Sequence, residues 1–124
     1  MTASSRYLLC VSMDVEPEHE ALFNEVYDSE HVPYLMEVDG VRAVTRAKGE
    51  SFRFAMAGNL KDVDAPSPSY IAMYEIDSPD VVASDAWARA VETGRWATHV
   101  RPHTSNRSHA MYQIIAATGA GQSS

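Results

Sequence analysis

Two stretches of this chain alternate so that both faces of a β-strand would be apolar. In residues 7–15, Leu9 and Val11 lie on one face and Leu8 on the other, and residues 70–76 repeat the pattern with isoleucine and methionine on the second face. Apolar side chains on both faces are stable only where both faces of the sheet are covered. Any fold for this chain must therefore supply a covering layer on each side of its sheet.

The rest of the chain predicts an alternating order of strands and helices. Pro17 suits a first helical turn, and Gly40 and Gly94 suit helix ends. Pro33 disfavours helical geometry at Val32, which predicts a kink or a restart of the first helix there. The segments that we predict are strands at residues 7–15, 41–46, 70–76 and 109–115, and helical regions at residues 17–40 and 79–94.

Two further segments need an interpretation of their own. The second helical region opens with Ser78 as an N-cap and Pro79 in the first turn, and Ser84 marks a restart within it. Residues 52–56 alternate again, so they either extend the second strand or form one arm of a hairpin. Residues 59–69, with their two prolines, predict a loop.

The order strand, helix, strand, strand, helix, strand is typical of the ferredoxin-like α+β fold, an antiparallel sheet with helices on one face. Two helices leave the second apolar face bare. The simplest cover is the sheet of a second copy, so we predict a homodimer whose two sheets enclose a barrel-like interior where a ligand can sit. The alternative is that residues 59–69 or the chain ends cover that face.

Composition places the chain among ordinary globular proteins. With 124 residues we predict one domain at residues 7–116, between disordered tails at residues 1–6 and 117–124. A net charge of −7 argues against a nucleic-acid partner, and no apolar run resembles a signal peptide or reaches the length of a membrane span. Cys10 is the only cysteine, which excludes an internal disulfide. We expect a cytoplasmic protein without a membrane partner.

An aromatic stripe follows the first helix and ends close to its proline. Phe23, Tyr27, His31 and either Tyr34 or Leu35 recur at spacings of three and four, which is the spacing of one helix face. Kinked helix ends free backbone groups and often border functional sites. The stripe therefore marks this helix end as a candidate site.

The same stretch resembles a known superfamily. A helix that ends Tyr-x-x-Glu-His-x-Pro, followed by a Gly-Val pair that opens the next strand, is similar to the dimeric α/β-barrel superfamily, and most of all to its EthD-like branch. The chain departs from the branch at Asp39, where relatives often have proline. The residues that carry the resemblance are Tyr27, Glu30, His31, Pro33, Gly40 and Val41.

The resemblance implies a ligand pocket between the sheet and the first helix, and an enzyme that needs no cofactor. It makes His31 the candidate general base or acid, oriented by Asp28 or Glu30. The alternative is a core or capping histidine. Three tyrosines are candidates for hydrogen bonds to a substrate oxygen, the first two of them as catalytic residues: Tyr27, Tyr34 and Tyr74.

A second group of candidates lies near the end of the chain. If residues 96–101 are extended, His99 and Arg101 share a face, and Arg101 is suited to a substrate carboxylate. The alternative is a surface loop whose arginines pair with the excess of acids. We add Trp87 to the substrate-binding candidates on the strength of the resemblance.

Metal and haem are not expected. Pro102 breaks the helix that would align His99 with His103, so His99, His103 and His109 do not predict a metal site. Some barrel relatives degrade haem with an asparagine, a tryptophan and a histidine, but the spacing of Asn24 and Trp87 from His31 does not match that pattern.

The function that follows is proton transfer on a small phenolic, polyketide-like or aromatic-catabolite substrate. The outcome would be isomerisation, cyclisation, dehydration or decarboxylation, as in a lyase or isomerase. Two alternatives stay open: a cofactor-free monooxygenase on the same scaffold, and a non-catalytic dimer that binds a small molecule or supports another enzyme.

Overall fold

The computed structural model describes residues 7–120. The tails predicted at residues 1–6 and 121–124 lie outside the described residues, whereas residues 117–120 follow the last strand without forming a helix or strand of their own. In the described part of the chain, no helix is long and apolar enough to cross a membrane.

Four strands form the main sheet: β1 (Tyr7–Val15), β2 (Val41–Lys48), β5 (Tyr70–Ile76) and β6 (Thr104–Gln113). Their order is β2-β5-β1-β6, and each strand is antiparallel to its neighbours. This is the predicted ferredoxin-like arrangement. The last strand begins at Thr104, earlier than predicted, because Thr104 pairs with Val15 across a register shift in β1.

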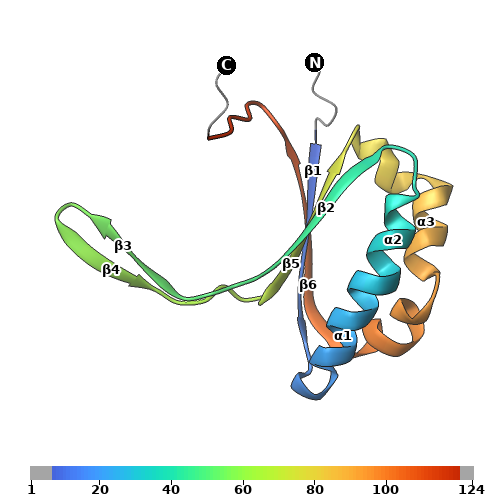
Figure 1. The fold of residues 1–124 in the computed structure, drawn as a ribbon, viewed down its shortest axis with the longest axis horizontal. Coiled ribbons are helices and arrows are strands. Elements are labelled where there is room, and N and C mark those ends of the chain that lie inside the picture. Colours follow the sequence, from blue (N-terminus) through green and yellow to red (C-terminus); the bar gives the residue numbers. More distant parts are fainter. Residues whose placement is uncertain (1–6, 121–124) are drawn as a thin grey trace.

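The helical segments lie on one side of this sheet (Figure 1). The first runs from a 3₁₀ turn (Pro17–His19) through α1 (Glu20–Val26) and a π-helical turn (Tyr27–His31) to α2 (Val32–Met36). The second comprises a 3₁₀ turn (Pro79–Ala83), α3 (Asp85–Glu92), a π-helical turn (Trp96–Val100) and a short 3₁₀ turn (Arg101–His103).

The second region starts as predicted, with Ser78 at the N-cap position and Pro79 in the first turn. The Ser78 side chain makes no capping bond, and its backbone carbonyl accepts from the Val81 N–H. The side-chain cap belongs to Ser84, whose hydroxyl accepts from the Trp87 N–H at 3.2 Å. Gly94, at φ +78°, follows α3 as predicted.

A hairpin arm, β3 (Phe52–Met56) and β4 (Asn59–Val63), extends away from the sheet on the side opposite the helices (Figure 1). Residues 59–63 were predicted as loop, and that part of the prediction was wrong. Ala57 and Gly58 form a two-residue turn with positive φ at both positions, the geometry that matches the twist of paired strands. The turn therefore directs Asn59 onward into pairing with β3.

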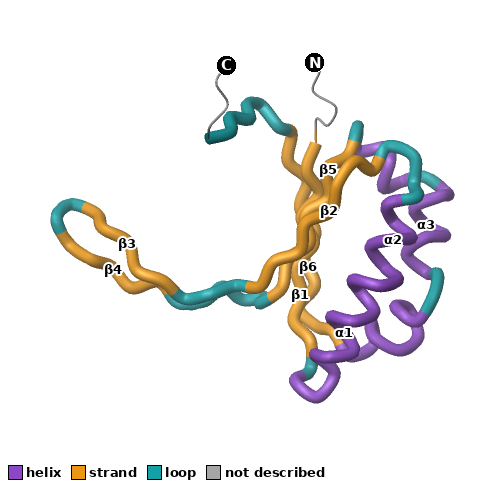
Figure 2. The backbone as a smooth tube through the Cα atoms, in the orientation of Figure 1, coloured by secondary structure: helices purple, strands orange, loops and turns teal. Residues whose placement is uncertain are grey.

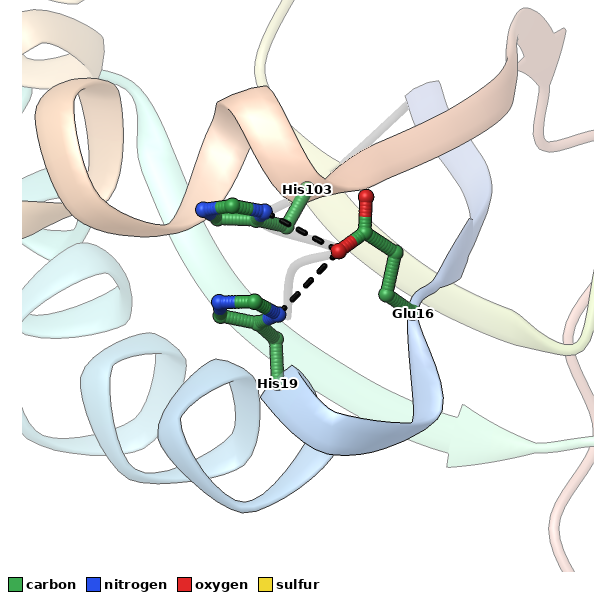
Figure 3. A group of neighbouring side chains, drawn as sticks. All are labelled: Glu16, His19 and His103. Atoms are coloured by element: carbon green, nitrogen blue, oxygen red, sulfur yellow. Dashed lines mark hydrogen bonds and ion pairs between the residues drawn. The ribbon is translucent and has the colours of Figure 1, made fainter.

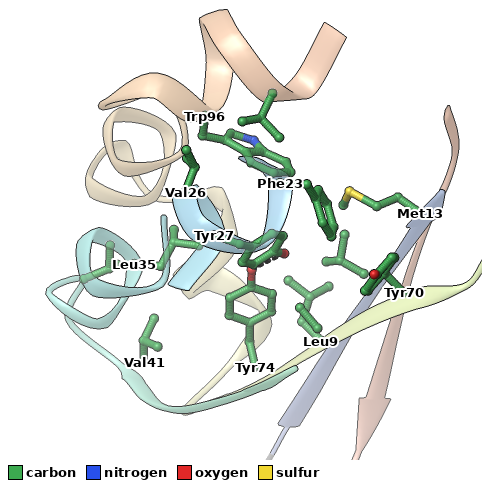
Figure 4. Close-up of a cluster of buried hydrophobic side chains, with 14 of the residues drawn as sticks. Leu9, Met13, Phe23, Val26, Tyr27, Leu35, Val41, Tyr70, Tyr74 and Trp96 are labelled. Atoms are coloured by element: carbon green, nitrogen blue, oxygen red, sulfur yellow. Dashed lines mark hydrogen bonds between the residues drawn. The ribbon is translucent and has the colours of Figure 1, made fainter. Parts of the chain in front are cut away.

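The core fills the space between the sheet and the helices (Figure 4). From the sheet come Leu9, Met13 and Tyr74, and from the first helical segment come Phe23 and Leu35, all almost fully buried. The opposite face of the sheet has no helix over it (Figure 2). It carries the half-buried apolar residues of the alternation, among them Leu8, Cys10, Ile71 and Met73.

Candidate functional site

A cavity of about 340 Å³ lies between the sheet and the helices. Its walls are mainly apolar: Leu9 and Val11 contribute from β1, Leu35 from α2, and Trp87 and Val91 from α3. A volume of this size accommodates a small organic molecule. The resemblance implied a pocket on this side of the sheet.

Two π-helical turns bring aromatic side chains to this cavity. An Xaa-Pro pair follows each turn directly: Val32-Pro33 follows the first turn and Arg101-Pro102 follows the second. A proline has no N–H and its ring crowds the preceding turn, so the widened π turn relieves the clash inside a helix. The sequence predicted a kink or a restart at Val32-Pro33; the helix widens into the π turn, and α2 begins at Val32.

The two turns meet at His31 and Trp96. The imidazole is 4 % exposed and stacks on the Trp96 indole, with 4.4 Å between ring centroids and 22° between planes. The Tyr27 ring meets both at centroid distances of 5.0 Å. The Nδ1 atom of His31 is buried and has no hydrogen-bond partner among the described residues. A buried nitrogen in this state is free to bond to a ligand.

Burial keeps His31 neutral. Burial first, and then the charge of Arg101, lower the pKa of His31 from 6.5 to about 4, although Glu92 acts in the opposite direction. From the sequence alone, the His31 imidazole was expected to have an ordinary pKa near 6.5. The structure instead has an imidazole that is uncharged at neutral pH and offers one lone pair and one N–H.

Tyr27 and Tyr74 form a buried pair beside His31. Their hydroxyl oxygens are 2.9 Å apart, and either one can donate to the other. Burial raises the pKa of both phenols, so both stay protonated. One O–H is used within the pair, which leaves the second proton available to a ligand oxygen.

Cations lie along the cavity wall nearest β6. Arg101 is held by two hydrogen bonds of 2.8 Å to the carboxylate of Glu92. Arg107 also lines the cavity, and no carboxylate pairs with it in residues 7–120. With His109 beside it on the wall, this guanidinium makes the cavity suited to a ligand with an anionic or acidic oxygen.

Five of the predicted site residues line the cavity and four do not. The five are His31, Tyr27, Tyr74, Trp87 and Arg101.

The other four have partners or positions elsewhere. Asp28 is exposed and pairs with Arg46 at 2.7 Å, and Glu30 accepts from the backbone and side chain of Arg95. Neither carboxylate contacts His31, so neither orients it in this structure. Tyr34 lies against Gly94, and His99 is exposed with its Nδ1 2.7 Å from the Thr98 hydroxyl.

Residues 96–101 are not extended, so His99 and Arg101 do not share a face. Residues 96–100 form a π-helical turn, and Trp96 and Val100 are both buried, at 4 % and 1 % exposed.

Among the polar and aromatic residues that line the cavity, three were not predicted as catalytic or substrate-binding: Trp96, Arg107 and His109. The period-two pattern of β6 was a usable signal. His109 pairs with Val11 and lies on the same face, and Arg107 is two residues earlier in the strand.

The histidines proposed and rejected as a metal site are not brought together. In residues 7–120 the group with metal-binding potential contains His103 but neither His99 nor His109. The haem pattern is not assembled either, because Asn24 bonds to Arg46 at 2.8 Å and does not line the cavity.

No protein-family profile and no curated protein sequence matches this chain. Solved structures do. An ethyl tert-butyl ether degradation (EthD) family protein from Bacillus halodurans has a TM-score of 0.54 at 12 % identity, over 88 % of this chain and 99 % of its own. A protein of unknown function from Nitrosomonas europaea has a TM-score of 0.56 at 13 % identity, over 94 % and 96 %.

A third match is the haem degrader MhuD from Mycobacterium tuberculosis, solved with two haems in its active site, with a TM-score of 0.52 at 12 % identity over 91 % of this chain and 99 % of its own. These likenesses, together with the strand order, decide the fold. The chain has a ferredoxin-like α+β fold, similar to that of these solved structures. At these identities the likeness extends to the fold alone.

Proposed function

We propose that this protein is a cofactor-independent enzyme that transfers a proton within a small aromatic or polyketide-like substrate bearing an acidic oxygen. The observation that carries the proposal is the unpartnered, buried Nδ1 of His31, a residue that lines the cavity together with the Tyr27–Tyr74 pair. A polar group without a hydrogen-bond partner in an apolar interior raises the free energy of the folded protein, and a ligand that bonds to it lowers that free energy again.

The chemistry assigned to each group follows from its charge state. The neutral imidazole of His31 accepts a proton from the substrate and returns it at another atom. The free O–H of the tyrosine pair donates to the enolate or phenolate oxygen that develops. Arg107 holds a carboxylate or phenolate at the cavity wall, and a bound anion raises the proton affinity of His31 from its low resting value.

The chain supplies its own binding reporter, because both of its tryptophans line the cavity. We expect 1-hydroxy-2-naphthoate to quench their fluorescence at micromolar concentrations, and naphthalene, which has no acidic oxygen, to bind at least tenfold more weakly. Arg107→Gln should remove most of the difference in affinity between 1-hydroxy-2-naphthoate and naphthalene. Equal affinity for the two compounds would contradict the assignment of the cations.

Turnover is tested with deuterium. In D₂O, ¹H NMR of a panel of cyclic β-diketones and phenolic acids should show enzyme-dependent exchange at a carbon beside the oxygen-bearing carbon, and His31→Gln should lower that rate by roughly 10²–10⁴-fold. His99→Gln, at an exposed histidine outside the cavity, is the matched control. No exchange with any compound, together with retained binding, would favour the non-catalytic alternative. Oxygen consumption in place of exchange would favour the monooxygenase.

We further propose that the working form is a homodimer. The sheet face without helices carries apolar residues, and the arm extends on that same side with Phe52, Phe54, Met56 and Leu60 exposed. A second copy placed against the sheet would cover both surfaces at once. Native mass spectrometry at micromolar concentration tests this, and a monomer would contradict it.

A further inference from the structure

A second group of titratable side chains lies at one end of the sheet, where β1 ends and β6 begins (Figure 3). Glu16 and His19 lie in the turn after β1, and His103 ends the 3₁₀ turn before β6. The two segments are joined by a backbone bond from the Glu16 N–H to the His103 carbonyl oxygen, 3.0 Å long. One possible ligand atom from each residue lies within 4.8 Å of the other two.

Two of the three separations between the ligand atoms match those around a shared metal ion. Glu16 Oε1 is 3.2 Å from His19 Nδ1 and 3.1 Å from His103 Nδ1. Zinc bonds of roughly 2.0–2.1 Å at tetrahedral angles separate neighbouring ligand atoms by about 3.3 Å. The imidazole rings stack 3.5 Å apart and within 8° of parallel, and each Nδ1 atom contacts the same carboxylate oxygen (Figure 3).

Hydrogen bonding alone does not satisfy this group. His103 Nδ1 bonds to Glu16, but His19 Nδ1 is buried and has no hydrogen-bond partner among the described residues, because its contact with Glu16 lacks hydrogen-bond geometry. An ion between the three atoms would satisfy His19 Nδ1 as well. The side chains remain 30 % to 51 % exposed, which leaves room for a water as fourth ligand.

We propose that Glu16, His19 and His103 form a zinc site outside the cavity. Two imidazoles and one carboxylate are a donor set for Zn²⁺, with Co²⁺ as a substitute, and not for Mg²⁺ or Ca²⁺, which prefer all-oxygen ligands. None of the three residues lines the cavity. The ion would link the start of the first helical segment to the start of β6. From the sequence alone, no metal site was expected.

The test uses the full chain, stripped with EDTA and dialysed. Calorimetric titration should give one Zn²⁺ per chain, and Co²⁺ should give the visible absorption of a four-coordinate site. Glu16→Gln and His103→Ala should each weaken binding by roughly a hundredfold or more. A hundredfold excess of Zn²⁺ over the wild-type Kd should raise the Tm of the wild type by roughly 5–15 °C and that of each variant by about 2 °C or less.

His99→Ala, at an exposed histidine in the neighbouring turn, is the control and should bind as the wild type does. Glu16→Gln preserves side-chain shape, so it keeps the test valid if His103→Ala fails to fold. Absence of stoichiometric binding to the wild type, or binding retained in both variants, overturns the proposal. Binding lost instead in His109→Ala, a cavity residue, also overturns it, because the ion would then lie elsewhere.

Discussion

At the scale of single residues, the site depends on groups kept neutral by burial. His31 is uncharged because its surroundings are apolar and Arg101 is near. Tyr27 and Tyr74 stay protonated because they are buried. Such groups provide polar chemistry without the cost of burying an ion. They also make stability depend on pH in a defined direction.

The His31 imidazole should make the fold sensitive to acid. Its pKa is about 4 in the folded chain and 6.5 in the unfolded chain, so between these values the unfolded chain binds more protons. The stabilising contribution is complete above pH 6.5 and is lost as the pH falls to 4, a change of roughly 3 kcal/mol. Urea unfolding at pH 7.0 and 4.5 should show a smaller difference for His31→Leu than for the wild type. If the change in unfolding free energy between the two pH values were equal in both proteins, the pKa of His31 would not be lowered in the folded chain.

The tyrosine pair should show coupled mutational effects. Tyr27→Phe or Tyr74→Phe leaves the other hydroxyl buried without its partner and should cost about 1–3 kcal/mol of unfolding free energy. The double variant removes both hydroxyls and should cost less than the sum of the single variants. Urea denaturation of the four proteins gives the coupling energy, and simple additivity would show that the two hydroxyls do not interact.

At the scale of elements, the two π-helical turns place the aromatic residues of the site. Each precedes an Xaa-Pro pair, and each begins with an aromatic residue, Tyr27 in one and Trp96 in the other. The i→i+5 bonding widens the turn, as in the bond from the Val32 N–H to the Tyr27 carbonyl oxygen. Widened turns of this kind are poorer than α-helix in stability and recur at functional sites.

Replacing Pro33 should therefore stabilise the fold and weaken ligand binding. Pro33→Ala restores an N–H within the first helical segment, and we expect unfolding free energy to rise by roughly 1–2 kcal/mol while naphthoate binding weakens by about tenfold. Pro79→Ala is the control, because Pro79 occupies a first-turn position that suits proline and should give no gain. Tighter binding in Pro33→Ala would show that the turn does not position His31.

The order of elements could be predicted from this sequence, whereas the π turns and the second strand of the arm could not. Alternation in β1 and β5 predicted two-faced strands, and helical spacing placed Tyr27 and His31 together. A period of 3.6 cannot distinguish an α turn from a π turn, so the stacking on Trp96 was not predictable. In the arm, the side chains of Asn59–Val63 do not alternate clearly, and their pairing depends on the turn at Ala57.

At the scale of the whole molecule, the bare sheet face and the arm together support association with a second copy. Met73 lies in the middle of that face, on the central strand β5. We expect Met73→Glu to shift the protein to monomer at micromolar concentration in light-scattering chromatography, because a charge would then be buried in the interface. Ala88→Glu, on the exposed side of α3, is the control. A dimer that persists in Met73→Glu would place the interface elsewhere.

Each π turn also sets the rotation of the helix that follows it. A π turn accommodates one residue more than an α turn of equal rise, so deleting one residue from Tyr27–His31 would rotate the later helical residues relative to the sheet. Pro33 would then crowd a tighter turn. The one additional residue therefore both accommodates the proline and sets the direction in which the residues after it point.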